Sequence, residues 1–384
     1  MKAGWIKTTV GAAFDTATGG TPPKSNSAFY GNYLPLVKPP ELCDAELETA
    51  EDGLSEDGAA VARIAPPNSI LVSCIGNLGK IGLNVVPVAF NQQINAILPD
   101  ASKATPWFMF YQTLSCSFKE QLESLASGTT VPIVNKSKFN SVEIVLPPIA
   151  EQHRIVAILD EAFDGIATAK ANAEKNLQNA RALFESHLQS VFTERGEGWV
   201  DKSLADVCEL INGRAYKKHE MLAAGKYPLL RVGNFFTNRD WYYSDLELEQ
   251  NKYCDNGDLL YAWSASFGPR IWDGGKVIYH YHIWRVLPNA TLVEKRFLLH
   301  LLEWDVEQIK QAHGTGTTMM HVSKGSMESR AVPLPPLNEQ EKIVALLDDL
   351  TVETQRLESL YQQKLTALDD LKKSLLNQAF SGAL

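Results

Sequence analysis

The sequence predicts an α+β protein in which a globular segment followed by a long helix occurs twice in tandem. Three observations predict this fold class: a repeated fifteen-residue motif, short β-branched runs before each copy of the motif, and apolar heptads after each copy. The chain has 384 residues, and a typical domain has roughly 100 to 200. We therefore expect two or three domains.

The repeated motif divides the chain. Residues 146–160 and 334–348 are identical at 10 of 15 positions at an offset of 188, whereas chance would give about one identity. Upstream, Gly4-Trp5 matches Gly198-Trp199 at an offset of 194, so the second copy is shorter by six residues. The expected segments are two globular ones, 1–145 and 199–333, and two helical ones, 146–198 and 334–384.

Each globular segment contains short β-branched runs separated by glycine, asparagine and proline, which is the pattern of strands and turns. The expected strands are 69–75, 81–90 and 94–98, then 227–232, 258–263 and 277–287. Apolar residues at spacings of three and four then predict one helix in each segment. These helices are 106–126 and 293–312.

After each Leu-Pro-Pro element, apolar side chains alternate by four and three residues, as in the seam of a coiled coil. The seam residues expected to pair the helices are Ile155, Leu159, Ile166, Leu183, Ile343, Leu347, Leu350, Leu357, Tyr361 and Leu368. The first helix has alanine at several positions where the second has leucine or tyrosine. Small side chains on one helix can receive large ones on the other, so the two helices are expected to be partners.

The net charge is −9, from 36 basic and 45 acidic residues, which by itself argues against a nucleic-acid-binding protein. Eight of the acidic residues, however, fall within residues 41–57, and residues 199–333 carry 16 charges of each sign. Both globular segments can therefore present a basic face. Many of their basic residues lie in loops beside glycine and amide side chains, which suits phosphate contacts and base readout. A solvated loop is the ordinary alternative.

Motifs for catalysis and for metal binding are not found in the sequence. The glycines in residues 76–80 do not have the spacing of a phosphate-binding loop, and motifs for methyl transfer or metal-dependent nucleases are missing. His280 and His282 lie on one expected strand without a third ligand, which favours a packed or DNA-facing strand over a metal site. The five cysteines predict no disulfide framework. The longest apolar runs are too short to span a membrane, and we expect a cytoplasmic protein.

A globular segment followed by a helix that opens Leu-Pro-Pro-x-x-Glu-Gln-x-x-Ile-Val, present twice, resembles the specificity subunit of type I restriction-modification systems. The loop Gly19-Gly20-Thr21-Pro22 is similar to the loop after the family's first strand, and Gly257-Asp-Leu-Leu to its Gly-Asp-Ile-Leu strand. Asn68 stands where the family usually has glycine. The resemblance covers essentially the whole chain.

The resemblance implies two target recognition domains, each reading one half of a split double-stranded DNA site. It also implies that the two helices form an antiparallel coiled coil, in a pseudo-twofold arrangement, which sets the gap and docks two modification (adenine methyltransferase) subunits. The chain itself is then non-catalytic and holds no cofactor, since S-adenosylmethionine, ATP and Mg²⁺ belong to the partner subunits, among them restriction and translocase subunits. A stand-alone DNA-binding regulator or scaffold without a methyltransferase partner is one alternative, and a truncated enzyme with unrecognised catalytic residues is another.

Glutamine can bond the edge of adenine, and arginine can bond that of guanine. For Gln92 and Gln93, the alternative is that one of the pair faces solvent from a half-buried strand. The residues expected to contact DNA are Gly20, Thr21, Lys24, Asn77, Lys80, Gln92, Gln93, Thr129, Thr130, Lys136 and Lys138 in the first segment, and Asn212, Arg214, Lys217, Lys218, Arg231, Asn234, Arg270, His282, Thr317 and Lys324 in the second.

Overall fold

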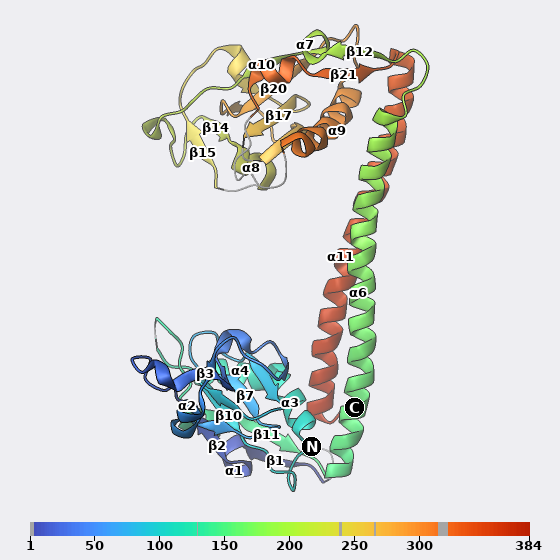
Figure 1. Cartoon of the computed structure of the whole chain (residues 1–384). Helices are drawn as coiled ribbons and strands as arrows, with labels where there is room; N and C mark the ends of the chain where they lie inside the picture. The colour runs from blue at the N-terminus through green and yellow to red at the C-terminus, as the bar shows by residue number, and fades with distance from the viewer. Residues whose placement is uncertain (1–3, 129, 238–239, 265, 314–321) are drawn as a thin grey trace. The chain divides into compact units, whose positions relative to one another are not determined.

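The structure is a computed structural model that describes residues 4–128, 130–237, 240–264, 266–313 and 322–384. They form two compact units. The first unit consists of Met1–Glu174 with Gln362–Leu384, and the second of Lys175–Tyr361. Each unit contains one globular domain and a stretch of each of the two long helices, α6 (Ile149–Thr193) and α11 (Leu337–Ser381) (Figure 1).

Two sheets form most of the first domain. One has the strand order β2-β10-β7-β8-β4 and the other β5-β3-β9-β6. A separate ribbon pairs the first strand, β1, with the strand that leads into Leu-Pro-Pro, β11. The bounds are β1 Ile6–Thr9, β2 Thr16–Thr18, β3 Tyr30–Val37, β4 Ala45–Leu47, β5 Gly53–Leu54, β6 Ile64–Ala65, β7 Ile70–Ser73, β8 Ile81–Asn84, β9 Val88–Phe90, β10 Ile94–Ile97 and β11 Glu143–Leu146.

The second domain repeats this topology. Its sheets have the orders β13-β20-β17-β18 and β15-β14-β19-β16, and its ribbon pairs β12 with β21. Only β4, an edge strand drawn from the acidic segment 41–57, has no counterpart among the described strands. The bounds are β12 Val200–Ser203, β13 Cys208–Asn212, β14 Tyr227–Leu230, β15 Tyr242–Ser244, β16 Tyr253–Cys254, β17 Leu259–Ser264, β18 Ser266–Ile271, β19 Val277–Tyr279, β20 Ile283–Pro288 and β21 Ala331–Leu334.

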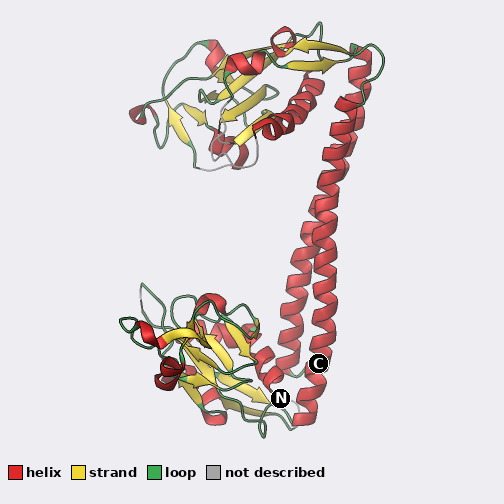
Figure 2. Ribbon diagram, in the orientation of Figure 1, coloured by secondary structure: helices red, strands yellow, loops and turns green. Residues whose placement is uncertain are grey.

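Helices flank the sheets of both domains (Figure 2). Those of the first domain are α1 Val10–Ala13, α2 Glu56–Val61, α3 Pro106–Leu114, α4 Cys116–Leu125 and α5 Lys136–Asn140, with 3-10 turns η1 Ser27–Phe29 and η2 Pro39–Glu41. Those of the second are α7 Leu204–Val207, α8 Val232–Thr237, α9 Lys295–His313 and α10 Lys324–Glu328, with η3 Lys218–Glu220 and η4 Gln250–Lys252. The duplicated α+β architecture expected from the sequence is confirmed.

Three expected elements are interrupted. The strand expected over 81–90 is two strands, β8 and β9, with Pro87 between them, because proline cannot donate to a strand ladder. The strand expected over 277–287 is β19 and β20, joined by a turn in which Ile283 N donates to His280 O at 2.9 Å. The helix expected over 106–126 breaks at Ser115, whose backbone is extended and whose hydroxyl caps α4.

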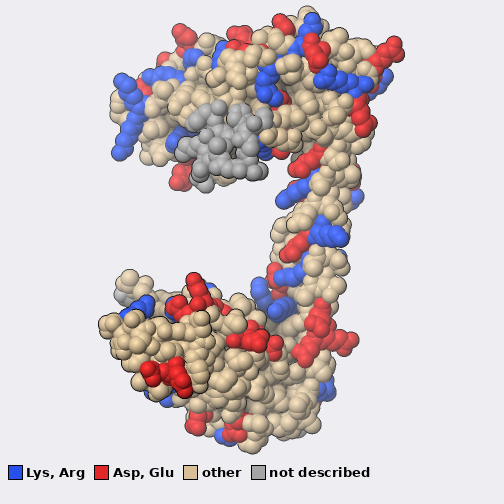
Figure 3. All heavy atoms as spheres, viewed as in Figure 1, with Lys and Arg blue, Asp and Glu red and all other residues tan. Residues whose placement is uncertain are grey.

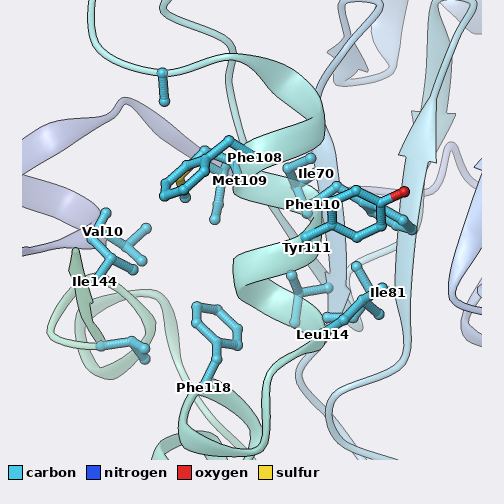
Figure 4. Close-up of a cluster of buried hydrophobic side chains, with 14 of the residues drawn as sticks. Val10, Ile70, Ile81, Phe108, Met109, Phe110, Tyr111, Leu114, Phe118 and Ile144 are labelled. Atoms are coloured by element: carbon cyan, nitrogen blue, oxygen red, sulfur yellow. The ribbon is translucent and has the colours of Figure 1, made fainter. Parts of the chain in front are cut away.

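The core of the first unit lies around α3. Side chains of Phe108, Phe110 and Leu114 meet Ile70 of β7 and their neighbours on β8 and β11 (Figure 4). All are nearly inaccessible to water. Full burial of an aliphatic or phenyl side chain stabilises by about 1.5 to 3 kcal/mol, so this cluster fixes α3 against the sheet.

Asn68 and Gly257 have the same unusual backbone conformation, with positive φ angles of 68° and 87°. Asparagine is one of the few residues other than glycine that adopts this region readily. This shared conformation explains why asparagine can stand before β7 where glycine stands before β17.

The glutamine of each Leu-Pro-Pro motif is buried and fully hydrogen-bonded. Gln152 accepts from Thr105 N at 2.9 Å and donates to Lys103 O and Pro147 O, both at 2.9 Å. Gln340 accepts from Glu294 N at 2.8 Å and donates to Leu292 O and Pro335 O, both at 2.9 Å. In each unit one amide thus joins the long helix to the start of the helix that packs on the sheet.

About two turns further along, an aspartate of each long helix receives a polar side chain from its domain. Asp160 accepts from Tyr111 Oη in the first unit. In the second, Asp348 lies 3.0 Å from His300 Nε2 and is paired with Arg296 at 2.6 Å. His300 Nδ1 lies 2.9 Å from Glu303, and these hydrogen bonds raise the pKa of the imidazole against the opposing effect of burial.

The stretches of α6 and α11 within each unit lie side by side and run antiparallel (Figure 1). In the first unit Lys170 pairs with Asp369, and the ammonium of Lys372 lies 4.9 Å above the ring of Phe163. In the second unit Arg181 pairs with Glu358 at 2.7 Å. The antiparallel pairing is confirmed in both units.

The seam follows the predicted heptads only up to Ala173 and Tyr361. Ile155, Leu159, Ile166, Ile343 and Leu347 are buried, while Leu350, Leu357 and Tyr361 are half-buried. Beyond this point the less exposed positions are 177, 180, 184 and 188 in α6 and 365, 368, 372 and 376 in α11. Leu368 therefore stays in the seam.

The prediction for Leu183 is wrong, since its side chain is 57% exposed. The seam positions run 169, 173, 177 in α6 and 357, 361, 365 in α11. Each helix thus has two successive spacings of four residues, which shift the seam by one position relative to the heptad repeat. Such a stutter offsets the drift of a 3.6-residue helix relative to a 3.5-residue repeat. Beyond Leu183, α6 packs Leu188 and Phe192 into the core of the second domain.

Replacing Gln340 by alanine should lower the free energy of unfolding by about 2 to 4 kcal/mol, because two carbonyls and one amide would be buried without partners. Gln152→Ala should behave alike in the first unit. The matched control is Gln355→Ala at an exposed position of α11, which should change stability by less than about 0.5 kcal/mol. Urea unfolding measures both, and equal effects of Gln340→Ala and Gln355→Ala would contradict the structural role.

The second unit should lose stability as the pH rises above 6.5 and through the folded pKa of His300. The folded pKa of His300 lies above its ordinary 6.5, so its protonation stabilises fully below pH 6.5 and this contribution disappears as the pH rises through the folded pKa. His300→Gln should remove this pH-dependent contribution to stability. Thermal unfolding of both proteins from pH 5.5 to 8.5 tests it, and parallel pH curves would show that His300 does not contribute.

Candidate nucleic-acid interface

A glycine loop crosses a tight turn in the first unit. Gly19 N donates to Ile94 O at 3.0 Å, and Gly20 N donates to Phe90 O at 2.9 Å. The loop therefore lies directly on the turn 91–94 that joins β9 to β10. A Cβ on Gly19 would stand 2.1 Å from Asn91 O, whereas a Cβ on Gly20 would meet nothing within 4 Å. Only glycine fits at the first position.

The second unit repeats this geometry with other side chains. Gly213 N donates to Ile283 O at 3.2 Å, and Arg214 N donates to Tyr279 O at 3.0 Å. A Cβ on Gly213 would stand 2.4 Å from both His280 O and Tyr279 O. The turn 280–283 thus occupies the place of the turn 91–94.

Further loops join this end of each domain. Cys74 N donates to Gln93 O at 2.7 Å, and Gly76 N donates to Pro132 O at 2.9 Å. These bonds bring the β7–β8 loop, which carries Asn77 and Lys80, and the loop that carries Thr130 beside the turn. In the second unit, Trp263 N donates to His282 O at 3.1 Å in the equivalent place.

Side chains of the first turn are amides. Gln92 is exposed and its Oε1 lies 3.2 Å from Thr21 Oγ1, which donates to it. Gln93 is half-buried and accepts from Asn91 Nδ2 at 3.1 Å. The two glutamines lie in the turn rather than in a strand, and it is Gln92 that faces solvent.

Side chains of the second turn are aromatic rings. His280, Tyr281 and His282 have ring centroids 4.0 to 4.8 Å apart, and Trp263 lies 5.0 Å from His282. Burial lowers the pKa of His280 to about 4, so its imidazole is neutral at physiological pH. The two turns therefore offer different chemistry on the same backbone.

The predicted cations fall into three groups. Lys24, Lys136, Lys217, Lys218 and Arg231 are exposed, and the guanidinium of Arg231 lies 5.4 Å from the centre of the Tyr242 ring. Lys80 is half-buried. The remaining four have partners within the protein. Arg214 pairs with Glu220 at 2.7 Å, Arg270 with Asp273 at 3.0 Å and Lys324 with Glu328 at 3.4 Å, while Lys138 donates to Leu125 O at 2.8 Å.

Two predicted amides and three predicted threonines differ in their surroundings. Asn212 accepts from Trp284 Nε1 at 2.6 Å. Asn234 is only 5% exposed and its amide bonds Arg231 N and Leu229 O, so we remove it from the candidate surface. Thr130 is exposed. Thr129 and Thr317 lie outside the described residues.

Sequence reasoning missed one cation beside each glycine loop. Arg63 donates to Thr18 O at 2.7 Å, and Lys252 donates to Asn212 O at 2.9 Å. The two residues are 189 positions apart, close to the repeat offset, and this alignment is the signal that could have found them.

The part of the chain that is described contains no cluster of three or more histidine, cysteine and acidic side chains that could hold a metal ion. None of its helices is long and apolar enough to cross a membrane.

The paired domains match a known family twice. The model of the type I restriction modification DNA specificity domain matches residues 3–178 and 196–367. The chain belongs to this family. The type I resemblance that the repeated motif indicated is therefore confirmed.

Individual type I specificity subunits match over different lengths. That of HindI from Haemophilus influenzae is 34% identical over 168 residues, which are 42% of this chain and 36% of that protein. Those of StySPI from Salmonella potsdam and EcoKI from Escherichia coli K12 are 21% and 22% identical, and both matches cover 100% of this chain and 90% of the relative.

Solved type I structures share the fold. A chain from a study of complex assembly and conformational transition in a type I R-M system has a TM-score of 0.85 at 20% identity, covering 100% of this chain and 99% of that one. The HsdS subunit from Thermoanaerobacter tengcongensis has a TM-score of 0.63 at 19% identity, covering 100% and 98%.

In this type I specificity chain, Gly19→Ala should distort the first glycine loop, because the new methyl group meets backbone oxygens that cannot withdraw as a flexible side chain can. We expect a stability loss of about 1 to 3 kcal/mol and weaker DNA binding. Gly20→Ala, one residue away in open space, is the control for folding and should leave the free energy of unfolding close to the wild-type value. Denaturant unfolding and a DNA-binding titration compare the two, and equal behaviour would argue against the tight loop.

Proposed function

We propose that this chain is the non-catalytic DNA-recognition subunit of a type I restriction-modification complex, and that each unit reads one half of a bipartite site. One observation carries the proposal. In both units, backbone hydrogen bonds hold the glycine loop against the turn, and we call this arrangement the clamp. The turn reads Asn-Gln-Gln at 91–93 in the first unit and His-Tyr-His at 280–282 in the second.

The difference between the turns supports two different half-sites. The amide of Gln92 can both donate and accept, which matches the N6 and N7 edge of adenine. The second turn offers imidazole and phenol groups and apolar ring surface, which suit other base edges and the methyl group of thymine. We infer that the two half-sites differ in sequence.

The negative net charge does not oppose DNA binding by the two domains. On the face drawn in Figure 3, basic and acidic side chains are interspersed over the second domain, while the first domain shows mainly acidic ones. Exposed lysines such as Lys24, Lys217 and Lys218 lie in the loops of the candidate surface. Phosphate contacts need only local cations at the contact points.

The long helices suit the docking of partner subunits. In α11, Leu346, Val352 and Leu360 are each at least 50% exposed, and a docked partner would remove this apolar surface from water. Two modification subunits are the partners we propose. S-adenosylmethionine, ATP and Mg²⁺ would bind in the modification and restriction subunits, in the cytoplasm, and not in this chain.

Exchanging residues 1–145 for the first domain of another family member should change one half of the methylated site and leave the other half intact. Exchange of residues 199–333 is the reciprocal control. Mapping of methylated adenines after reconstitution with the modification subunits measures both. A change in both halves after a single exchange would refute independent reading by the two units.

A further inference from the structure

Each unit holds a cation against the carbonyl that precedes its glycine loop. Arg63 Nη1 donates to Thr18 O at 2.7 Å, and Thr18 is the last residue of β2. Lys252 Nζ donates to Asn212 O at 2.9 Å, and Asn212 is the last residue of β13. The position is the same in both units although the side chain differs.

A carbonyl needs only a donor, and a neutral amide or hydroxyl would serve as well. Both units nevertheless place a full positive charge there. Neither charge has a carboxylate within ion-pairing distance among the described residues, in contrast to Arg214, which is paired with Glu220. The positive charge therefore remains available to a ligand.

The surface beside Arg63 is hollowed. A depression of about 340 Å³ is lined by Arg63, Val61 and Ala62 on one side and by the glycine loop, residues 19–23, on the other. One guanidinium hydrogen bond to Thr18 O leaves four further N–H donors on Arg63, and Lys252 likewise keeps two. The depression thus lies between the fixed guanidinium of Arg63 and the glycine loop, whose glycines allow a ligand to come close to the backbone.

We propose that Arg63 and Lys252 each bind a DNA phosphate beside the glycine loop of their own unit. The inference rests on the proposed function, since it assigns where the duplex backbone meets each unit. The carbonyl bond fixes the cation relative to the loop, and the loop is fixed on the turn. A phosphate held by this cation would therefore set the register of the turn over the bases, because phosphate contacts position a protein and base contacts specify the sequence.

The test measures the salt dependence of DNA binding by the full chain. Arg63→Gln and Lys252→Gln keep a donor for the carbonyl but remove the charge. For each variant the slope of log Kobs against log salt should become shallower by about 0.9, and for the double variant by about 1.8. Specific and unrelated duplexes should weaken alike. Arg63→Lys should restore most of the slope.

The matched control is Arg154→Gln, which removes an exposed arginine from α6, where it is paired with Glu151, and should leave the slope unchanged. Unfolding midpoints of all variants report any loss of structure. Slopes equal to that of the wild type, with DNA still bound, would overturn the phosphate contacts and leave a purely structural role. Failure of the wild-type chain to bind any duplex would instead overturn the proposed function itself.

Discussion

The buried glutamine of each Leu-Pro-Pro motif is the contact on which the rest of each unit depends. Its amide satisfies two carbonyls and one N–H that would otherwise be buried without partners, and each such group costs about 1 to 3 kcal/mol. The same side chain ties the long helix to the helix that packs on the sheet. Because a buried amide bonds only in one geometry, the domain is held on its helix at one angle.

A second constraint acts at the opposite end of each domain, where backbone hydrogen bonds hold the glycine loop on the turn. Gly19 and Gly213 make this approach possible, and these backbone bonds do not depend on the side chains of the turn, although Gln92 also accepts a bond from Thr21. The turn can therefore change from Asn-Gln-Gln to His-Tyr-His without loss of its backbone bonds. A fixed scaffold with variable side chains is the arrangement that lets two copies of one domain serve two half-sites.

The sequence predicted the duplication, the long helices and their pairing, because the repeat and the heptads are regular and long. It failed where local geometry decides. Leu183 fits the heptad but lies beyond a stutter, and Asn234 resembles a surface amide but caps its own helix. Arg63 and Lys252 were missed because no local motif marks them and only their alignment near the repeat offset links them; the fold brings each to the carbonyl before a glycine loop, 45 and 40 residues away in sequence.

The charge balance bears on how such a protein discriminates between sites. Non-specific affinity for DNA comes almost entirely from phosphate neutralisation, and a chain of net charge −9 has few cations to spare for it. Several cations at the loops, such as Arg214 and Arg270, are already paired with carboxylates. Weak attraction to arbitrary duplex leaves a larger share of the binding energy to base contacts. A small number of well-placed cations then favours specificity over affinity, as a recognition subunit requires.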